Sequence, residues 1–505
     1  MSTNQSHPNE IAPEDQYQII CPYCFNEVSD GDNIGNQPFS HTAVHFRAET
    51  YFKDERAVEQ KLGVSKLDIE MMPDSYEREQ KEKNYEQAEC FVLKQDEKYQ
   101  AFWDSYDKQT TEQEDRLNQG PRPWELPIIQ TGRGIAELIA DDDGFVTAAV
   151  DVYGRITRRR VCPFCHNPLP LGYGKNSVKY ISIIGITGAG KTVYISQLLK
   201  GMMEYAAKAG LSAFFTSSHE ANFIEDNPVA EGVPLPGSTS PNRLSQPMFY
   251  DIVQSDGQRK REDTIVLYDI AGENCRKAEK MVNFAKFVQH SNGIILLIDP
   301  KQLKLLVSDD KASDTDAPSL ALNTLHAVLE THAGRKSKVP MAICISKGDQ
   351  CFNILPPIAQ DPVQYADRDE NGMPTKEFDG KSYNQLERDL TQLMQKHALP
   401  VCNILENNYW NFNFFSVSAI GCECGMTEKG IAPLFAPTPR RIEEPILWLF
   451  KQFGFIRSNV NVYRPFKIKR PSRLVSKRKL FKTITVEVDD GYATYEEDPI
   501  DTARQ

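Results

Sequence analysis

Long apolar segments are absent from this sequence of 505 residues. The first ten residues, MSTNQSHPNE, are polar, so we expect no signal peptide at this end of the chain. No apolar run approaches the roughly 18 residues that a membrane helix needs, and the run Ile294–Ile298 has only the length of a strand. These absences argue against a helical membrane protein and predict a cytoplasmic protein without a membrane span.

An excess of positive charge is also missing. The formal net charge is −12, which argues against nucleic-acid binding by the chain as a whole. The eleven cysteines are odd in number, and without an export signal they predict reduced thiols and metal ligands rather than disulfides. A hydrophobic share of 40% and a charged share of 25% are typical of a soluble globular protein, and this length predicts several domains.

From about residue 176 the chain alternates between strand-like and helical patterns. Strands are expected in VKYISIIGI, MFYDIV, TIVLYDI, GIILLID, MAICIS and FNFFSVS, and helices near 192–207, 318–332, 384–397 and 441–452. Such alternation predicts an α/β fold with a mostly parallel sheet flanked by helices. We assign this domain to residues 176–454, between an N-terminal region 1–175 and a tail 455–505, and find no internal repeat.

A phosphate-binding loop is indicated by GITGAGKT, which leaves the first of these strands and opens the first helix. Glycines let the backbone N–H groups wrap around phosphate oxygens, Lys191 adds positive charge, and the Thr192 hydroxyl can bind Mg²⁺. The following helix directs its positive end at the same anion. The expected phosphate-site residues are Gly185, Gly188, Ala189, Gly190, Lys191, Thr192 and Val193.

With this loop the chain resembles the TRAFAC-class P-loop GTPases over about residues 178–452. DIAGE, at Asp269–Glu273, follows an apolar strand and is similar to the DxxG element of that family. The resemblance implies that Asp269 holds Mg²⁺ through water and that the Gly272 N–H contacts the γ-phosphate. A carboxylate at a strand end beside a phosphate loop is also the anchor that a hard cation needs.

SKGD, at Ser346–Asp349, resembles the family's base-reading NKxD motif, with serine in place of the usual asparagine. A carboxylate at Asp349 can accept from both N1–H and the exocyclic amine of guanine, a donor pair that adenine lacks. The aliphatic stem of Lys347 would lie over the purine face.

SVSAI, at Ser416–Ile420, is similar to the family's SAK element. Ser418 and Ala419 match that element, whereas Ile420 replaces its lysine. The resemblance therefore implies only a backbone contact from Ala419 to the guanine oxygen. Motifs in this order, each after a strand, lie where open α/β sheets bind ligands.

Further residues bear on the first switch and on hydrolysis. The resemblance places the first-switch threonine before the strand that pairs with the DxxG strand, which selects Thr239 as a Mg²⁺ ligand and leaves Thr216 as its rival. Glu273 follows DxxG where many relatives have glutamine, so Lys191 and Glu273 are the expected catalytic residues. No arginine finger can be assigned, and one supplied by a partner is worth roughly 10³–10⁵ in rate, so we expect slow intrinsic hydrolysis.

CPYC and CPFC indicate a metal site in the N-terminal region. Two such pairs make the Cys₄ tetrahedron of a structural zinc ribbon. The expected zinc ligands are Cys21, Cys24, Cys162 and Cys165. Loop closure across the 137 residues between the pairs costs a few kcal/mol, against about 10–16 kcal/mol of apparent zinc-binding energy in small fingers. Two separate redox pairs or unligated cysteines are the alternatives.

The residues beside and beyond these pairs receive simpler interpretations. His166 is expected at the surface rather than as a ligand, and Cys422 and Cys424 as ordinary thiols. A charged insertion, about 38–145, is expected to be mainly helical. Its core stripe is Val92, Tyr99, Phe102, Trp103 and Tyr106. A hairpin is expected to turn near Gly154.

The tail carries ten lysines or arginines and no acid between Arg457 and Lys482, and then becomes acidic. Such a run is usually solvated or paired with acids, and docking on nucleic acid or an acidic partner is the alternative.

Together the motifs predict a GTP/GDP-binding switch with an unidentified protein effector. They look most like bacterial double-GTPase-type proteins, which are predicted switches of conflict systems. There are two rival hypotheses. One is an ATP-driven P-loop enzyme, and the other is a zinc-ribbon nucleic-acid-binding or scaffold protein with a structural nucleotide site.

Overall fold

The computed structural model describes residues 19–28, 45–49, 55–93, 96–105, 126–142, 145–186, 188–216, 219–237, 246–256, 259–270, 286–306, 315–330, 335–365, 377–458, 464–469, 473–479, 482–488 and 492–497. Within these ranges no helix combines the length and the apolar character that crossing a bilayer requires. Four of the predicted residues, Tyr106, Thr239, Gly272 and Glu273, lie outside the described ranges.

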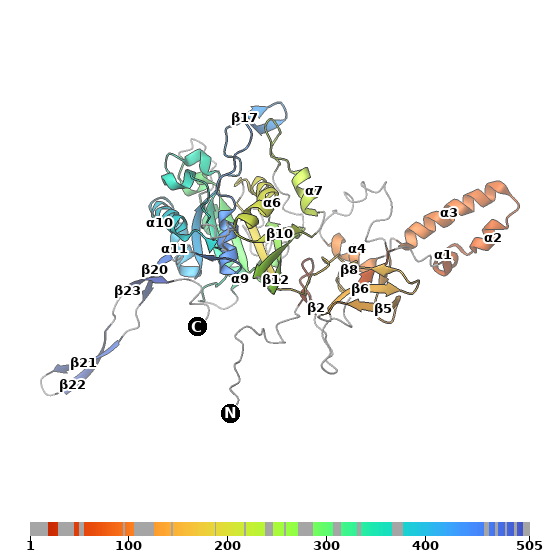
Figure 1. The fold of residues 1–505 in the computed structure, drawn as a ribbon, viewed down its shortest axis with the longest axis horizontal. Coiled ribbons are helices and arrows are strands. Elements are labelled where there is room, and N and C mark those ends of the chain that lie inside the picture. Colours follow the sequence, from red (N-terminus) through yellow and green to blue (C-terminus); the bar gives the residue numbers. More distant parts are fainter. Residues whose placement is uncertain are drawn as a thin grey trace.

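A seven-stranded sheet forms the centre of the molecule (Figure 1). Its strand order is β10 (Ser212–Phe215), β11 (Met248–Asp256), β12 (Arg259–Ile270), β9 (Val178–Gly185), β13 (Gly293–Ile298), β14 (Met341–Ile345) and β16 (Phe412–Ser416). The last five run parallel, whereas β11 is antiparallel to both of its neighbours. All six predicted strand segments are found, and the predicted mostly parallel α/β fold is confirmed.

Side-chain alternation along β13 explains why this sheet is covered on both faces. Ile294, Leu296 and Ile298 join one buried cluster, and Ile295 and Leu297 join the other. All six residues of the strand are buried, which is the continuous apolar pattern expected of a central parallel strand.

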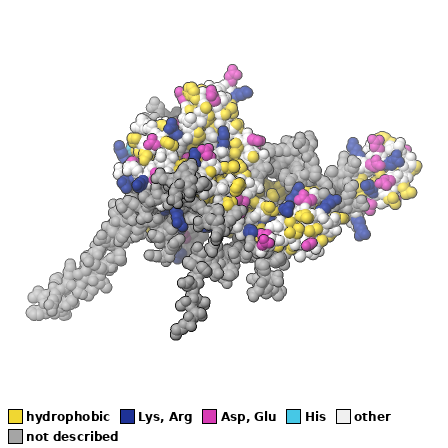
Figure 2. Space-filling view, viewed as in Figure 1, with side chains coloured by type: hydrophobic (Ala, Val, Ile, Leu, Met, Phe, Trp, Pro, Cys, Tyr) yellow, Lys and Arg dark blue, Asp and Glu magenta, His cyan; other side chains and the backbone are white. Residues whose placement is uncertain are grey.

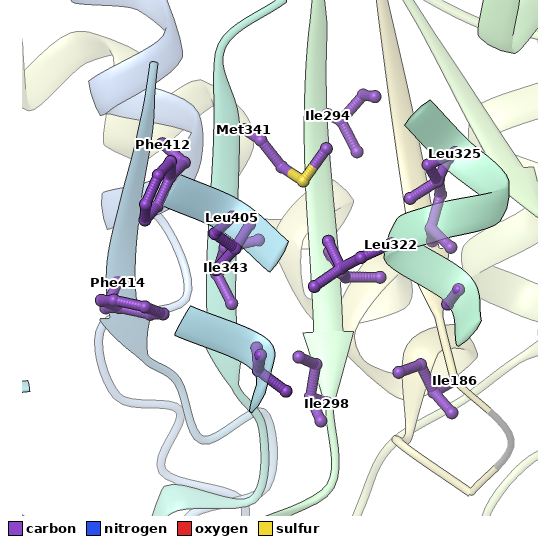
Figure 3. Close-up of a cluster of buried hydrophobic side chains, with 14 of the residues drawn as sticks. Ile186, Ile294, Ile298, Leu322, Leu325, Met341, Ile343, Leu405, Phe412 and Phe414 are labelled. Carbon is purple, nitrogen blue, oxygen red and sulfur yellow. The ribbon is translucent and has the colours of Figure 1, made fainter. Parts of the chain in front are cut away.

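Helices on each face complete these two cores. α6 (Lys191–Lys208) and α12 (Glu444–Gln452) contribute to one core, and α9 (Ala317–Leu329), α10 (Gly380–His397) and α11 (Leu399–Asn408) to the other. Figure 3 shows the second core, where side chains of α9 and α11 meet those of β13, β14 and β16. The helices predicted from sequence are therefore found within a few residues of their expected bounds.

Short elements connect this scaffold. They are α7 (His219–Asp226), η3 (Lys286–His290), η4 (Pro300–Leu303), η5 (Gly348–Cys351), η6 (Pro357–Gln360), β15 (Glu377–Phe378), β17 (Cys424–Thr427), β18 (Gly430–Pro433) and β19 (Arg457–Ser458). β17 and β18 form a hairpin, and β15 pairs with β19. Among these, η4 follows β13 and η5 follows β14 almost directly, so both lie at the edge of the sheet where ligands bind in this fold class.

The N-terminal region builds three small sheets. β1 (Ile19–Ile20) pairs with β2 (Glu27–Val28), β3 (His45–Arg47) lies between β4 (Ile128–Ile129) and β8 (Arg160–Val161), and β5 (Ile135–Ala140) with β7 (Ile156–Thr157) flanks β6 (Val146–Asp151). Gly154 has φ +78° between β6 and β7, which confirms the predicted turn. The strands β3, β4 and β5 lie within the insertion, which was expected to be mainly helical.

The described residues of the insertion include four helices: α1 (Glu55–Leu62), α2 (Lys66–Glu70), α3 (Ser75–Leu93) and α4 (Glu97–Asp104). Val58, Ile69 and Tyr85 form a small core among the first three, which project at one end of the molecule (Figure 1). Charged side chains of both signs cover that end (Figure 2). On α4, Tyr99 and Trp103 are buried, so their predicted core role is confirmed.

The tail forms antiparallel strand pairs that the sequence analysis does not predict. β20 (Arg464–Lys469) pairs with β23 (Tyr492–Glu497), and β21 (Arg473–Lys479) pairs with β22 (Lys482–Val488). β-branched residues in KTITVEV favour the extended conformation of β22. The proposed docking of the basic tail on a partner stays a prediction.

Candidate nucleotide and metal sites

The phosphate loop joins the end of β9 to the start of α6. Gly188 and Gly190 have φ +86° and +74°, a conformation that glycine adopts without strain. At Gly185 an added Cβ would lie 2.6 Å from Lys191 Cβ, so only glycine fits there. The predicted glycines are therefore required by backbone shape, and the loop places the N-terminus of an 18-residue helix toward any bound anion.

Two predicted residues of opposite charge meet at this loop. Asp269, near the end of β12, pairs in register with Ile183 of β9, and its carboxylate forms an ion pair with Lys191. Both side chains are buried. Thr192, the second residue of α6, is half-buried at the same strand edge, whereas Val193 packs with its side chain in the core. A buried lysine beside a carboxylate and a hydroxyl is a donor set that suits a phosphate with its metal ion.

The two predicted base motifs also come together. The Ser418 hydroxyl donates to a carboxylate oxygen of Asp349, and the Gly348 N–H donates to the Val417 carbonyl at 3.0 Å. Adjacent parallel strands β14 and β16 bring these loops side by side. Ser346 is buried and donates through its hydroxyl to the Ile298 carbonyl at 3.0 Å, so it ties the end of β14 to the end of β13.

Asp299 is a site residue that the sequence analysis missed. It follows β13 directly, is buried, and accepts from Lys347 Nζ at 2.8 Å. A Cβ at Gly190 would lie 3.6 Å from Lys347 Cε, so the base loop and the phosphate loop are neighbours. The available signal was an acid directly after the strand GIILLI, the same arrangement that led to Asp269.

The first-switch assignment stays open. Thr216 follows β10, and its Oγ1 is buried without a hydrogen-bond partner among the described residues. Its rival Thr239 lies outside the described residues, as do Gly272 and Glu273. These three therefore stay predictions.

The four predicted metal ligands converge in one cluster. Their Sγ atoms all lie within 4.8 Å of one another, and the sequence pairs are interleaved: Cys21 is 3.7 Å from Cys165, and Cys24 is 3.8 Å from Cys162. A tetrahedron with metal–sulfur distances of about 2.3 Å has sulfur–sulfur distances of about 3.8 Å. The residues therefore fit a tetrahedral zinc ion.

Charge in this cluster also suits a cation. Burial raises the pKa of the Cys21 thiol, whereas hydrogen bonds from the neighbouring thiols lower the pKa of Cys24. Repulsion among four adjacent thiolates opposes their ionisation, and a divalent cation between them would allow all four to ionise together.

Each cysteine pair forms a knuckle with the same backbone path. We call Cys21–Asn26 the first knuckle and Cys162–Asn167 the second knuckle. In the first, the Phe25 N–H donates to the Cys21 carbonyl at 2.9 Å and the Cys21 N–H donates to the Asn26 carbonyl at 3.0 Å. The equivalent bonds of the second have the same lengths, and the residue after the second cysteine is left-handed in both, with φ +57° and +53°.

His166 is that left-handed residue in the second knuckle, and the expectation of a surface position is wrong. Its Nδ1 lies 2.6 Å from Asp96 Oδ1, and only 9% of the residue is exposed. Arg47 binds the other oxygen of Asp96 at 2.6 Å and the His166 carbonyl at 3.0 Å. Burial opposes ionisation of Asp96, yet the hydrogen bond from His166 and the charge of Arg47 leave its pKa lowered.

The chain was compared with known proteins and solved structures. Residues 179–399 match the family described as Double-GTPase 2. A Mycolicibacterium smegmatis protein, described as a candidate ESX-1 scaffolding and assembly protein SaeC, is 22% identical over 332 residues, covering 59% of this chain and 80% of that protein.

Similar solved structures include the GTP-bound GTPase-like domain of Saccharomyces cerevisiae Ski7, with TM-score 0.25, 14% identity and coverage of 60% of this chain and 56% of that chain. A GTP-binding protein of Sulfolobus solfataricus in complex with GDP has TM-score 0.22, 14% identity and coverage of 55% and 53%. The chain thus spans little more than half the length of these two structures. Residues 179–399, which match the Double-GTPase 2 family, contain the phosphate loop, Asp269 and Asp349.

Proposed function

We propose that this protein is a Mg²⁺-dependent GTP-binding switch that hydrolyses GTP slowly. The observation that supports this most is the meeting of the phosphate loop, Asp269 and the Asp349–Ser418 pair at the carboxyl edge of one parallel sheet. That edge is where open α/β sheets bind ligands. The match of residues 179–399 to the Double-GTPase 2 family supports the same function.

The choice of guanine over adenine depends on Asp349. Its hydrogen bond from Ser418 holds the carboxylate toward the neighbouring loop, where both oxygens can serve as acceptors. Guanine presents two donors to such a group, and adenine presents none in the equivalent place. This difference disfavours the rival ATP-driven enzyme.

The phosphate end supplies binding and charge. Lys191 would leave Asp269 to contact the outer phosphates, and Thr192 with Asp269 would hold Mg²⁺, which would neutralise the charge that develops during phosphoryl transfer. Glu273 would orient water less well than glutamine because its negative charge repels the γ-phosphate. Slow turnover and dependence on a partner are therefore expected.

The first experiment exchanges the base specificity. In Asp349→Asn the side chain offers one acceptor and one donor, so binding should shift from guanine to xanthine nucleotides. Titration with fluorescent GTP and XTP measures this shift, which we expect to exceed about 100-fold in the affinity ratio because a buried charged hydrogen-bond partner is lost. Lys191→Ala is the control, since it should weaken both nucleotides equally. Unchanged GTP affinity in Asp349→Asn would refute the assignment of the base site.

A second candidate is a scaffold whose nucleotide site is structural. It is favoured by the description of the Mycolicibacterium smegmatis relative as a scaffolding and assembly protein. Phosphate release from Mg–GTP under single-turnover conditions separates the two candidates: bound nucleotide with no release over many hours supports the scaffold. In either case we propose that the four cysteines hold a structural zinc ion in the N-terminal region. We also propose that the compartment is the cytoplasm and that a protein effector exists in a bacterial conflict system.

A further inference from the structure

The first knuckle packs directly on the strand that carries Asp269. The Tyr268 hydroxyl donates to the Pro22 carbonyl at 2.8 Å, and both groups are buried. Pro22 lies between two cysteines of the metal cluster, and Tyr268 immediately precedes Asp269. A single hydrogen bond therefore connects the residue beside a metal ligand to the residue beside the expected Mg²⁺ ligand.

An aromatic stack strengthens this contact. The ring of Phe25, next to Cys24, is stacked on His290 with centroids 5.4 Å apart and an interplanar angle of 11°. It also lies 5.9 Å from Tyr268 and 6.2 Å from Phe287. Tyr268 and Phe287 stack on each other at 4.1 Å, so one ring of the first knuckle contacts both β12 and η3. Burial lowers the pKa of His290, which favours the neutral ring in this stack.

Two more tyrosines hold the residue that immediately precedes the first knuckle, Ile20. Tyr173 and Tyr180 place their hydroxyls 2.8 and 2.9 Å from the Ile20 carbonyl oxygen and 2.6 Å from each other. Burial raises the pKa of both phenols, so the hydroxyls keep their protons and donate. Buried polar groups that lose such partners are costly, so a small displacement of the knuckle is unfavourable. The chain around the first knuckle is therefore held in one fixed position against these tyrosines, which a purely apolar contact would not do.

From these contacts we infer that Phe25 and Tyr268 are positioning residues for Asp269, and that metal binding at the four cysteines and Mg–GTP binding stabilise each other. The metal fixes the first knuckle, the first knuckle fixes the end of β12, and Asp269 lies at that end. Coupling between two ligands is reciprocal. If bound zinc raises the affinity for GTP by a given factor, bound GTP raises the affinity for zinc by the same factor. This inference rests on the proposed GTP-binding function.

The second knuckle provides a matched control for this coupling. Phe164 has the same side chain as Phe25 and lies between two metal ligands, but it is 49% exposed. Phe164→Ala thus removes the same atoms beside the same metal cluster without touching the stack on Tyr268. Phe25→Tyr retains the aromatic ring and is the conservative variant.

The test follows zinc release from the full-length zinc-loaded protein into a chromogenic chelator, with and without a saturating non-hydrolysable GTP analogue and Mg²⁺. We expect the analogue to slow release in the wild type by about fivefold or more, within the usual range of coupling between sites. Phe25→Ala should retain about one zinc per chain but lose this protection. Phe164→Ala and Phe25→Tyr should keep the protection.

A second readout separates positioning from general stability. In Phe25→Ala, the Mg²⁺ concentration that half-saturates analogue binding should rise about fivefold or more, whereas GDP affinity without Mg²⁺ should not change. If the bound analogue does not slow zinc release in the wild type, the coupling inference is overturned and the proposed GTP-binding function is not. Failure of the analogue to bind at all, measured by fluorescence titration, would overturn the proposed function as well. Retained protection in Phe25→Ala would also overturn the inference.

Discussion

The two knuckles are alike in local structure and opposite in what they contact. CPYCFN and CPFCHN follow the same backbone path and contribute to the same metal cluster. The residue at the fifth position differs: Phe25 stacks on rings of the nucleotide-binding domain, and His166 binds Asp96, the N-cap of α4. One cluster of four cysteines thus joins the domain to the insertion through equivalent positions.

This difference shows that the backbone shape of a knuckle and the partner that the knuckle contacts have separate causes. The cysteines and the left-handed residue set the shape of a knuckle, because two thiolates that are to bind one metal ion must be brought together by a tight turn. The side chain on the left-handed residue then selects the contact. An apolar ring is buried against aromatic residues, whereas an imidazole requires a polar partner when it is buried.

The largest effect is expected when the metal ion proposed at the four cysteines is removed, because both knuckles depend on it. Cys162→Ser should lower zinc content from about one ion per chain to nearly none, because a Cys₄ site needs all four ligands. Hydrogen exchange should then rise in both knuckles and in α4, while GTP affinity should fall severalfold without being lost. Metal analysis and exchange mass spectrometry measure these effects.

Cys424→Ser is the matched control for that variant. Cys424 is exposed and outside the cluster, and partial burial raises the pKa of its thiol, so it is a protonated side chain with no metal role. An unchanged zinc content in Cys162→Ser, or wild-type protein purified without zinc and without exposure to chelators, would contradict the proposed metal site.

An intermediate effect is expected when only the second knuckle loses its contact. His166→Ala leaves the partly buried Asp96 carboxylate with Arg47 and the Tyr99 N–H but without its histidine partner, which should destabilise the attachment of α4 by about 1–3 kcal/mol. Exchange should increase in residues 97–104, and zinc content and GTP affinity should stay at wild-type values. Loss of GTP binding in this variant would show that the two knuckles do not have separate partners.

Sequence alone predicted those parts of the molecule that local patterns determine. β13 and β14 are uninterrupted apolar segments, and the phosphate loop has a spacing that the backbone requires, so both were located correctly. The four cysteines were recognised because each CPxC pair is a local motif.

The missed features depend on partners far along the chain. His166 meets Asp96 across 70 residues, and Tyr268 meets Pro22 across 246, so nothing near either residue in the sequence marks the contact. The similarity between CPYCFN and CPFCHN was the available signal that the positions after the cysteines are equivalent. These six-residue segments are too short to be recognised as an internal repeat.

The smallest effect concerns the last residue of each knuckle, where the comparison is most closely matched. Asn167 is 1% exposed, and its Oδ1 accepts from Trp103 Nε1 at 3.0 Å, whereas Asn26 is exposed and donates to Cys24 Sγ at 3.4 Å. Asn167→Ala leaves a buried indole donor unpaired and should cost about 1–2 kcal/mol, while Asn26→Ala removes one weak bond that water can replace and should cost about 0.5 kcal/mol or less. Denaturant unfolding of the zinc-loaded protein, followed by exchange in α4, measures both. Equal costs would mean that burial on α4 does not distinguish the second knuckle from the first.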